Sequence, residues 1–276
     1  MTEIYAEPTL KDLLADIRQA WLYVLAGAIA GLLAALAFFQ VSVSHYRAEM
    51  LIGPTSETAT ADITALLGQF DLPNLQYIVR RPGPSESADF VRFENIFTGP
   101  SVAAYLLEDK DFMKGLSEDR DFIFSGPVEI GSAVRLSEYL SRKVKINPVG
   151  ATYLRRVRYS HPDPRFASEL LSKIWKTADE MIRSEVRSQT DNRIAYVSEQ
   201  LDKVTHPQHR QALVSILMEQ EQIRMMVNMD EPFAAAVAEP SYASMKPYWP
   251  KRSLFFPSFI LIGAFLGYMI FSLRRA

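Results

Sequence analysis

The sequence predicts a membrane α/β protein in which two transmembrane helices flank an external α/β base domain that carries a long projecting helical hairpin. Three observations lead to this prediction. An uncharged apolar run lies near each end of the chain, strand-like segments lie beside both runs, and a helical pattern extends over residues 163–204. The expected segments are 1–20 and 274–276 at the termini, spans at 21–43 and 253–273, and the large domain at 44–252.

The composition fits folded domains and excludes several kinds of site. The chain has 276 residues, 48% of them hydrophobic, and its 30 basic and 32 acidic side chains nearly balance. Proteins that bind nucleic acid usually concentrate a basic excess on one face, so nucleic acid is not an expected partner. No cysteine is present, which excludes disulfides, thiolate metal sites and cysteine nucleophiles.

The N-terminal apolar run, residues 21–43, contains no charged residue. A helix of about 20 apolar residues crosses a hydrocarbon core of ~30 Å, so this run predicts a membrane span. A cleaved signal peptide is the alternative. We favour the span because signal peptides have apolar cores of only about 7–15 residues, and this run is longer.

The second apolar run, residues 253–273, is also uncharged and is followed by Arg274 and Arg275. Two spans place both termini on one side of the membrane and residues 44–252 on the other. Basic residues beside the spans are equally frequent on the two sides, so charge does not set the orientation. Long domains are translocated largely regardless of charge, which favours cytoplasmic termini and an external domain.

Each span contains a pair of glycines separated by three residues. Small residues at this spacing allow helix backbones to approach closely in lipid. The spans are therefore expected to pack against each other or against a neighbouring molecule. The glycines expected at this contact are Gly27, Gly31, Gly263 and Gly267.

Strands and helices alternate within the large domain. No motif is recognised in residues 54–130 as a whole, although Pro100 and the apolar spacing after it indicate a short helix. Turn-rich residues predict loops at 54–62 and 80–87. Alternation and turn signals predict strands at 45–52, 144–147, 153–160 and 233–241, and helical spacing predicts a helix at 132–143.

The longest helix is predicted to begin at Asp163 and Pro164, an N-cap acid followed by proline at the first helical position. If unbroken to residue 204, this helix is about 63 Å long, which exceeds the diameter of a compact domain of this size. A polar stretch at 183–193 is either a solvated part of this helix or a break. A second helix at 208–229 completes a hairpin. The apolar stripe of the long helix is expected to face other copies of the chain through Leu170, Ile174, Met181, Ile194 and Leu201.

Common catalytic motifs are absent, including the phosphate-binding loop, the serine nucleophile elbow and the paired-histidine zinc motif. Asp119 and Asp121 have the D-x-D spacing that some sugar-nucleotide enzymes use to hold a divalent cation, but a solvated turn is the favoured interpretation. His206 and His209 are interpreted as loop residues because a metal site needs three or four converging ligands. No catalytic residue, metal or cofactor is therefore expected.

Four stretches of the sequence are distinctive together: the lead into the first span, "YRAEMLIGP", the aspartate-proline start of the long helix, and the segment from "MMVNMDEPF" to the second span. They resemble the corresponding stretches of the Wzz-type polysaccharide co-polymerases, the chain-length determinants of bacterial surface polysaccharides. The proline-rich juxtamembrane part of that segment carries the most specific similarity, with Pro240, Pro247, Pro250, Lys251 and Arg252. The absence of a nucleotide-binding loop and of a tyrosine-rich tail implies the kinase-free branch.

The resemblance implies a ring- or bell-shaped homo-oligomer in a bacterial inner membrane, with the large domain in the periplasm. It implies a non-enzymatic regulator of the length of an O-antigen or exopolysaccharide, acting with a membrane glycan polymerase on a lipid-linked polysaccharide. An inner-membrane adaptor for capsule or exopolysaccharide export is the alternative. A membrane-anchored enzyme that uses Asp119 and Asp121 is a third possibility.

Overall fold

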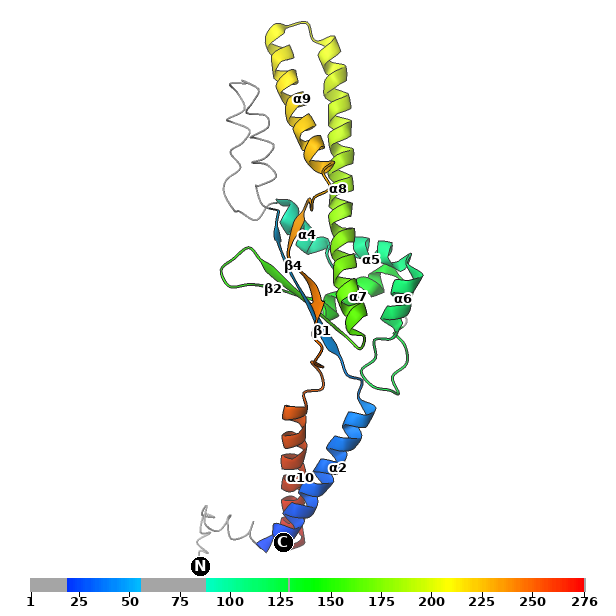
Figure 1. The fold of residues 1–276 in the computed structure, drawn as a ribbon, viewed down its shortest axis with the longest axis vertical. Helices are drawn as coiled ribbons and strands as arrows, with labels where there is room; N and C mark the ends of the chain where they lie inside the picture. The colour runs from blue at the N-terminus through cyan, green and yellow to red at the C-terminus, as the bar shows by residue number, and fades with distance from the viewer. Residues whose placement is uncertain (1–18, 56–87, 129, 276) are drawn as a thin grey trace, which may run out of the picture. The chain divides into compact units, whose positions relative to one another are not determined.

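The computed structural model describes residues 19–55, 88–128 and 130–275 (Figure 1). The expected loops at 54–62 and 80–87 fall almost entirely outside these residues. The chain divides into two compact units. Their described residues are 19–46, 120–127 and 246–275 in the first, here called the span unit, and 47–55, 88–119, 128 and 130–245 in the second, here called the sheet domain.

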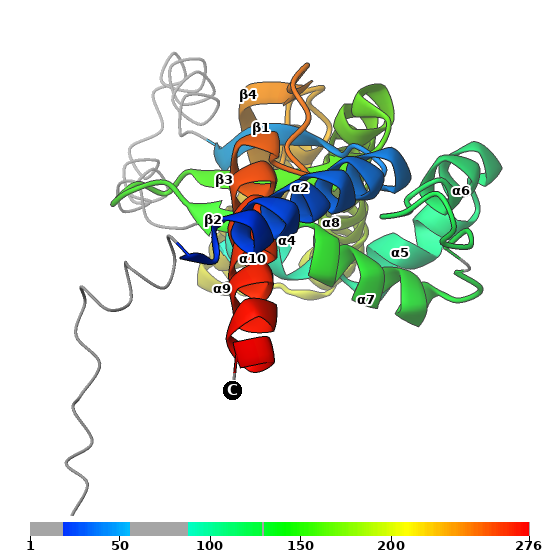
Figure 2. The same cartoon turned by 90° about the horizontal axis from the view of Figure 1, so that it is seen from below.

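The span unit contains the two apolar helices, α2 (Trp21–Val41) and α10 (Arg252–Arg275). Both are long and apolar enough to cross a membrane. They lie side by side and cross each other, as Figures 1 and 2 show. The helix α2 ends two residues before the predicted boundary because Ser42 is extended, and the N–H of Val43 donates to the carbonyl oxygen of Asp121.

The sheet domain is built on a four-stranded sheet with the order β2-β3-β1-β4. Its strands are β1 (Tyr46–Pro54), β2 (Lys145–Pro148), β3 (Arg155–His161) and β4 (Ala235–Ala243). The pairs β1–β4 and β2–β3 are antiparallel. All four strands overlap the segments predicted from alternation and turn signals. Because β1 pairs with β4, the sheet brings together the two parts of the chain that lie next to the spans in the sequence.

Among the described residues of this domain, four short helices accompany the sheet: α4 (Ala88–Ile96), α5 (Pro100–Leu107), α6 (Lys110–Ser117) and α7 (Ala133–Lys143). The helix α4 was not predicted. Where one helix was expected after Pro100, the structure has two, because the carboxylate of Asp109 accepts hydrogen bonds from the N–H groups of Asp111 and Phe112 and caps a new helix.

The helical hairpin consists of α8 (Pro164–Lys203) and α9 (Pro207–Val227). The Asp163 carboxylate accepts from the N–H of Arg165, 2.8 Å away, so the predicted N-cap is present. The helix α8 continues without a break through the polar stretch at 183–193. Within the sheet domain its first part packs against β3 and β4, and its second part packs against α9 (Figure 1).

This arrangement corrects part of the predicted oligomer face. Leu170 and Ile174 are fully buried in the core of their own chain, where α8 covers the sheet. They cannot also contact a second copy. The sheet therefore already covers the apolar side chains in the first half of α8. Met181 also packs against this core, whereas Ile194 and Leu201, further along α8, are half-buried.

Candidate functional site

The two apolar helices approach each other through the four predicted glycines. A Cβ atom added to Gly27 would lie 2.2 Å from the carbonyl oxygen of Gly263, and one added to Gly31 would lie 2.2 Å from that of Phe259. A Cβ atom on Gly267 would lie 2.1 Å from the carbonyl oxygen of Tyr23. No side chain fits at these distances, so glycine is what permits this contact. The partner of each glycine pair is the other helix of the same chain.

An aromatic cluster centred on Phe38 closes one end of this helix pair. The ring of Phe38 stacks on that of Phe255, with ring centroids 5.3 Å apart. Four further rings surround it at centroid distances of 5.7 to 6.2 Å, and they belong to Phe39, Phe122, Trp249 and Phe259. The cluster draws on three separate parts of the sequence, so it fixes the ends of α2 and α10 together with residues 120–127.

The proline-rich juxtamembrane segment is held to the chain that leaves α2. The His45 N–H donates to the Trp249 carbonyl oxygen at 2.9 Å, and the Tyr248 N–H donates to the His45 carbonyl oxygen at 2.7 Å. Pro250 follows a cis peptide bond and is buried, while Pro247 is exposed.

Along the sequence, the third proline of this segment, Pro240, precedes that bridge, and the basic residues Lys251 and Arg252 follow it. Lys251 lies 5.3 Å from the centre of the Tyr248 ring, a cation–π contact. Arg252 begins α10. Pro240 lies in the edge strand β4, at an irregularity of its pairing with β1, where the missing N–H of proline is tolerated.

Residues 120–127 form a short loop that joins the span unit. The Val43 N–H donates to the Asp121 carbonyl oxygen, and the Ile123 N–H donates to the Val41 carbonyl oxygen, both at 3.0 Å. Ser42 and Phe122 form the antiparallel bridge between these two bonds. This connection is not predictable from the sequence, because nothing local marks a loop that pairs with residues about 80 positions away.

The two carboxylates of the D-x-D pair contact different residues. Asp121 lies in the span unit, and its carboxylate faces the His45 ring with an Oδ1–Nε2 distance of 3.5 Å. Asp119 lies in the sheet domain and is 3% exposed, so the expected solvated turn is wrong for this residue. Among the described residues, no group of three potential metal ligands gathers at this or any other place.

The Asp119 carboxylate instead belongs to a buried polar cluster. It accepts a hydrogen bond from the Tyr139 hydroxyl and pairs with the Lys143 ammonium at 3.0 Å. The Tyr139 and Tyr159 hydroxyls are 2.9 Å apart. Burial, reinforced by the nearby acidic groups, raises the pKa of Tyr139. Burial likewise raises the pKa of Tyr159, and it lowers the pKa of the neighbouring His161.

We expect the sheet domain to lose stability above pH 10 because of this tyrosine pair. Unfolded tyrosines ionise near pH 10, whereas the folded pair keeps its protons. The unfolding free energy should therefore fall by up to ~1.4 kcal/mol per pH unit for each tyrosine. Replacing Tyr139 with phenylalanine should remove about half of the slope that the pair contributes. Denaturant melts between pH 9 and 11 measure it.

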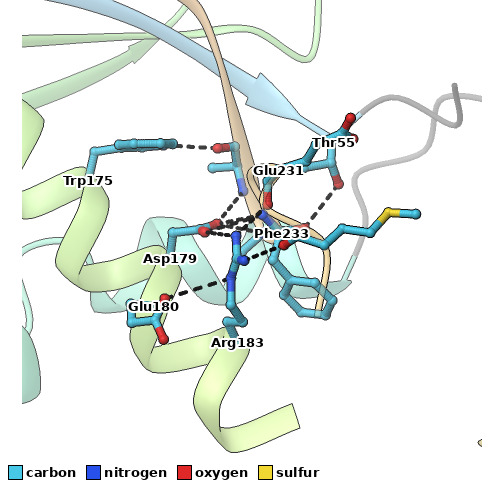
Figure 3. A network of polar contacts seen from close by, with 10 residues as sticks. Thr55, Trp175, Asp179, Glu180, Arg183, Glu231 and Phe233 are labelled. Carbon is cyan, nitrogen blue, oxygen red and sulfur yellow. Dashed lines mark hydrogen bonds and ion pairs between the residues drawn. The ribbon is translucent and has the colours of Figure 1, made fainter. Parts of the chain in front are cut away.

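A second buried network attaches β4 to α8 (Figure 3). The Asp179 carboxylate accepts hydrogen bonds from the N–H groups of Phe233, Ala234 and Ala235, at 2.7 to 3.4 Å. It also pairs with Arg183 at 3.2 Å. The Arg183 guanidinium donates to the carbonyl oxygens of Met229 and Glu231, which precede β4. This network fixes the point at which the chain turns from α9 back towards the sheet.

His206 and His209 lie at the start of α9, with ring centroids 5.0 Å apart. His206 is the N-cap residue, in keeping with the expected loop, but His209 is already helical, which corrects that part of the prediction. No third ligand accompanies them among the described residues. The pair lies at the tip of the hairpin, where α9 begins.

The hairpin exposes large apolar side chains. A hollow of about 400 Å³ between α8 and α9 is lined by Asn192, Arg193, Tyr196, Val197, Ile216 and Gln220. Tyr196 and Met218 are more than half exposed. The Gln220 Oε1 atom is buried and has no hydrogen-bond partner within the described part of the chain.

Comparisons with known proteins identify the fold. The sequence matches no protein-family model, and no curated protein is significantly similar to it. Among solved structures, it resembles a full-length bacterial polysaccharide co-polymerase at 14% identity and a TM-score of 0.51, over 97% of both chains. It also resembles a fragment of WzzB, a polysaccharide co-polymerase from Salmonella Typhimurium, at 11% identity and a TM-score of 0.39. That second match covers 75% of this chain and 100% of the fragment. The match to the full-length co-polymerase shows that the chain has this fold, with both apolar helices and the hairpin, as the sequence predicted.

Proposed function

We propose that this protein is a non-enzymatic regulator of the chain length of a bacterial surface polysaccharide, an O-antigen or an exopolysaccharide, of the kinase-free co-polymerase branch. The observation that supports this most strongly is the fold shared with a full-length co-polymerase over 97% of both chains. A match of that extent includes the apolar helices, the sheet and the hairpin together. A fold alone does not define function, so the contacts of individual residues have to agree with it.

The polar clusters support a structural rather than a catalytic role. The buried carboxylates of Asp119 and Asp179 are both occupied by donors of their own chain. A catalytic acid or base needs access to a substrate proton, which neither of these groups has. A catalytic role for the D-x-D pair, Asp119 and Asp121, is less well supported, because the two carboxylates contact different partners.

A homo-oligomer is part of this proposal, with a membrane glycan polymerase and a lipid-linked polysaccharide as the other partners. The exposed apolar side chains of the hairpin and the unsatisfied Gln220 Oε1 favour a further chain over this surface. Ile194 and Leu201 lie on the same part of α8. We place the large domain in the periplasm and the termini in the cytoplasm, because long domains translocate regardless of flanking charge.

Deletion of the gene tests this function. Chain-length regulation predicts that the polysaccharide is still made and still reaches the surface, but with a changed distribution of lengths on a gel. An export adaptor predicts the reverse, with polymer of normal length retained inside the cell. An unchanged ladder at an unchanged surface level would reject both roles.

A further inference from the structure

Residues 122–124, here called the apolar loop, expose large hydrophobic side chains next to the two apolar helices. Phe124 is 84% exposed and Ile123 is 53% exposed. Gly126 and Pro127 follow them, so turn residues end the loop on that side. Single exposed apolar residues are common, but adjacent ones of this size mark a contact surface.

The backbone of the apolar loop is attached to the last residues of α2. Ile123 donates to the carbonyl oxygen of Val41, the final residue of that helix, at 3.0 Å. The Phe122 ring lies 6.0 Å from that of Phe38, which is three residues, or about 4.5 Å, inside α2. If α2 crosses a membrane, Phe122 therefore lies at the depth of its last turn.

The side chains around the apolar loop are those that favour the membrane–water boundary. The Trp249 ring contacts that of Phe122 with centroids 6.0 Å apart. Tyr248 and Lys251 stand beside Trp249 in the sequence, just before α10, and the Lys251 ammonium lies over the Tyr248 ring. Aromatic rings concentrate at the headgroup layer, and basic side chains there reach anionic headgroups. Lipid is therefore the occupant that fits a patch continuous with both helices.

We propose that the apolar loop inserts Ile123 and Phe124 into the lipid headgroup–acyl boundary and forms a third membrane contact besides α2 and α10. This inference does not depend on the role in polysaccharide synthesis. It requires only that the two apolar helices cross a bilayer. The loop follows α6 and precedes α7 in the chain, so it provides an attachment from the middle of the sequence, separate from those at its two ends.

Single-cysteine labelling tests this proposal, because the chain contains no native cysteine. Full-length Phe124→Cys and Ile123→Cys proteins are labelled with a fluorophore and reconstituted into vesicles of phosphatidylethanolamine and phosphatidylglycerol. Both side chains are exposed, so neither change removes a buried contact. Quenching by lipids with a nitroxide near the headgroup should be strong, and quenching by aqueous iodide should be several-fold weaker than at Tyr153→Cys, an exposed position in the sheet domain.

The control Leu33→Cys lies on the exposed face of α2, eight residues or about 12 Å before its last residue, so it should be quenched by lipids with a nitroxide near the middle of the acyl chain and not by iodide. If the labels at 123 and 124 are quenched by iodide as strongly as at 153, the loop lies in water and the proposal is wrong. Shielding from both quenchers would also overturn it, because a protein surface, from a second copy or another chain, would then cover the loop. Failure of lipid to quench at 33 would remove the premise that α2 crosses the bilayer, and with it the proposal.

Discussion

Replacing Gly263 with valine is expected to separate α2 from α10. The first side-chain atom of any residue at this position would lie 2.2 Å from the Gly27 carbonyl oxygen, and a backbone atom cannot move aside as a flexible side chain can. Overpacking typically costs about 1–3 kcal/mol, so the equilibrium constant that favours the close arrangement over the separated one should fall about tenfold or more. The contact is internal to the chain, so this effect should be independent of protein concentration.

Cysteine pairs measure this change. The Tyr23 and Phe271 rings are 5.5 Å apart at the contact between the two helices, so a Tyr23→Cys, Phe271→Cys protein should be joined by a short cross-linker. Adding Gly263→Val should lower the yield. Ala30→Val, on an exposed position of α2, is the matched control and should leave the yield unchanged. Equal yields in the Gly263→Val and control proteins would contradict glycine-dependent packing.

Replacing Asp179 with alanine is expected to detach the start of β4. Three backbone N–H groups and the guanidinium of Arg183 would lose the same acceptor in a buried site. Removing one partner of a buried charged network costs about 3–5 kcal/mol. Amide hydrogen exchange at residues 233–235 should therefore accelerate about a hundredfold or more, since each 1.4 kcal/mol corresponds to a factor of ten.

Glu180→Ala provides the control for this prediction. Glu180 is the next residue on α8 and also pairs with Arg183, at 3.8 Å, but its side chain is 62% exposed. Exposed pairs contribute about 0–1 kcal/mol, so exchange at 233–235 should change little. If both variants had the same small effect, the Asp179 network would not be what holds β4 in place.

The elements with strong local signals were predictable from the sequence. Asp163 and Pro164 define the start of α8 because the cap and the fixed φ of proline act within one turn. The apolar runs identify α2 and α10 by length and composition alone. The helix α4 was missed because it follows a stretch rich in proline and glycine, and its nine residues offer little periodicity.

The site residues were only partly predictable. Glycine spacing located the α2–α10 contact, but spacing could not decide between the other span and a neighbouring molecule. Leu170 and Ile174 were assigned to an oligomer face because a helical stripe does not show which surface covers it, and here the sheet does. The connections of Asp119, Asp179 and Phe122 join positions far apart in the chain, so no local pattern could reveal them.

The length distribution of the polysaccharide in a complemented deletion strain tests the proposed function most directly. The deletion strain receives either this gene on a plasmid or the empty plasmid, and the released glycans are sized. Chain-length regulation predicts that the gene restores the narrow parental distribution while the empty plasmid leaves it altered. Superimposable distributions from the two strains, with the protein present in the membrane of one, would contradict it.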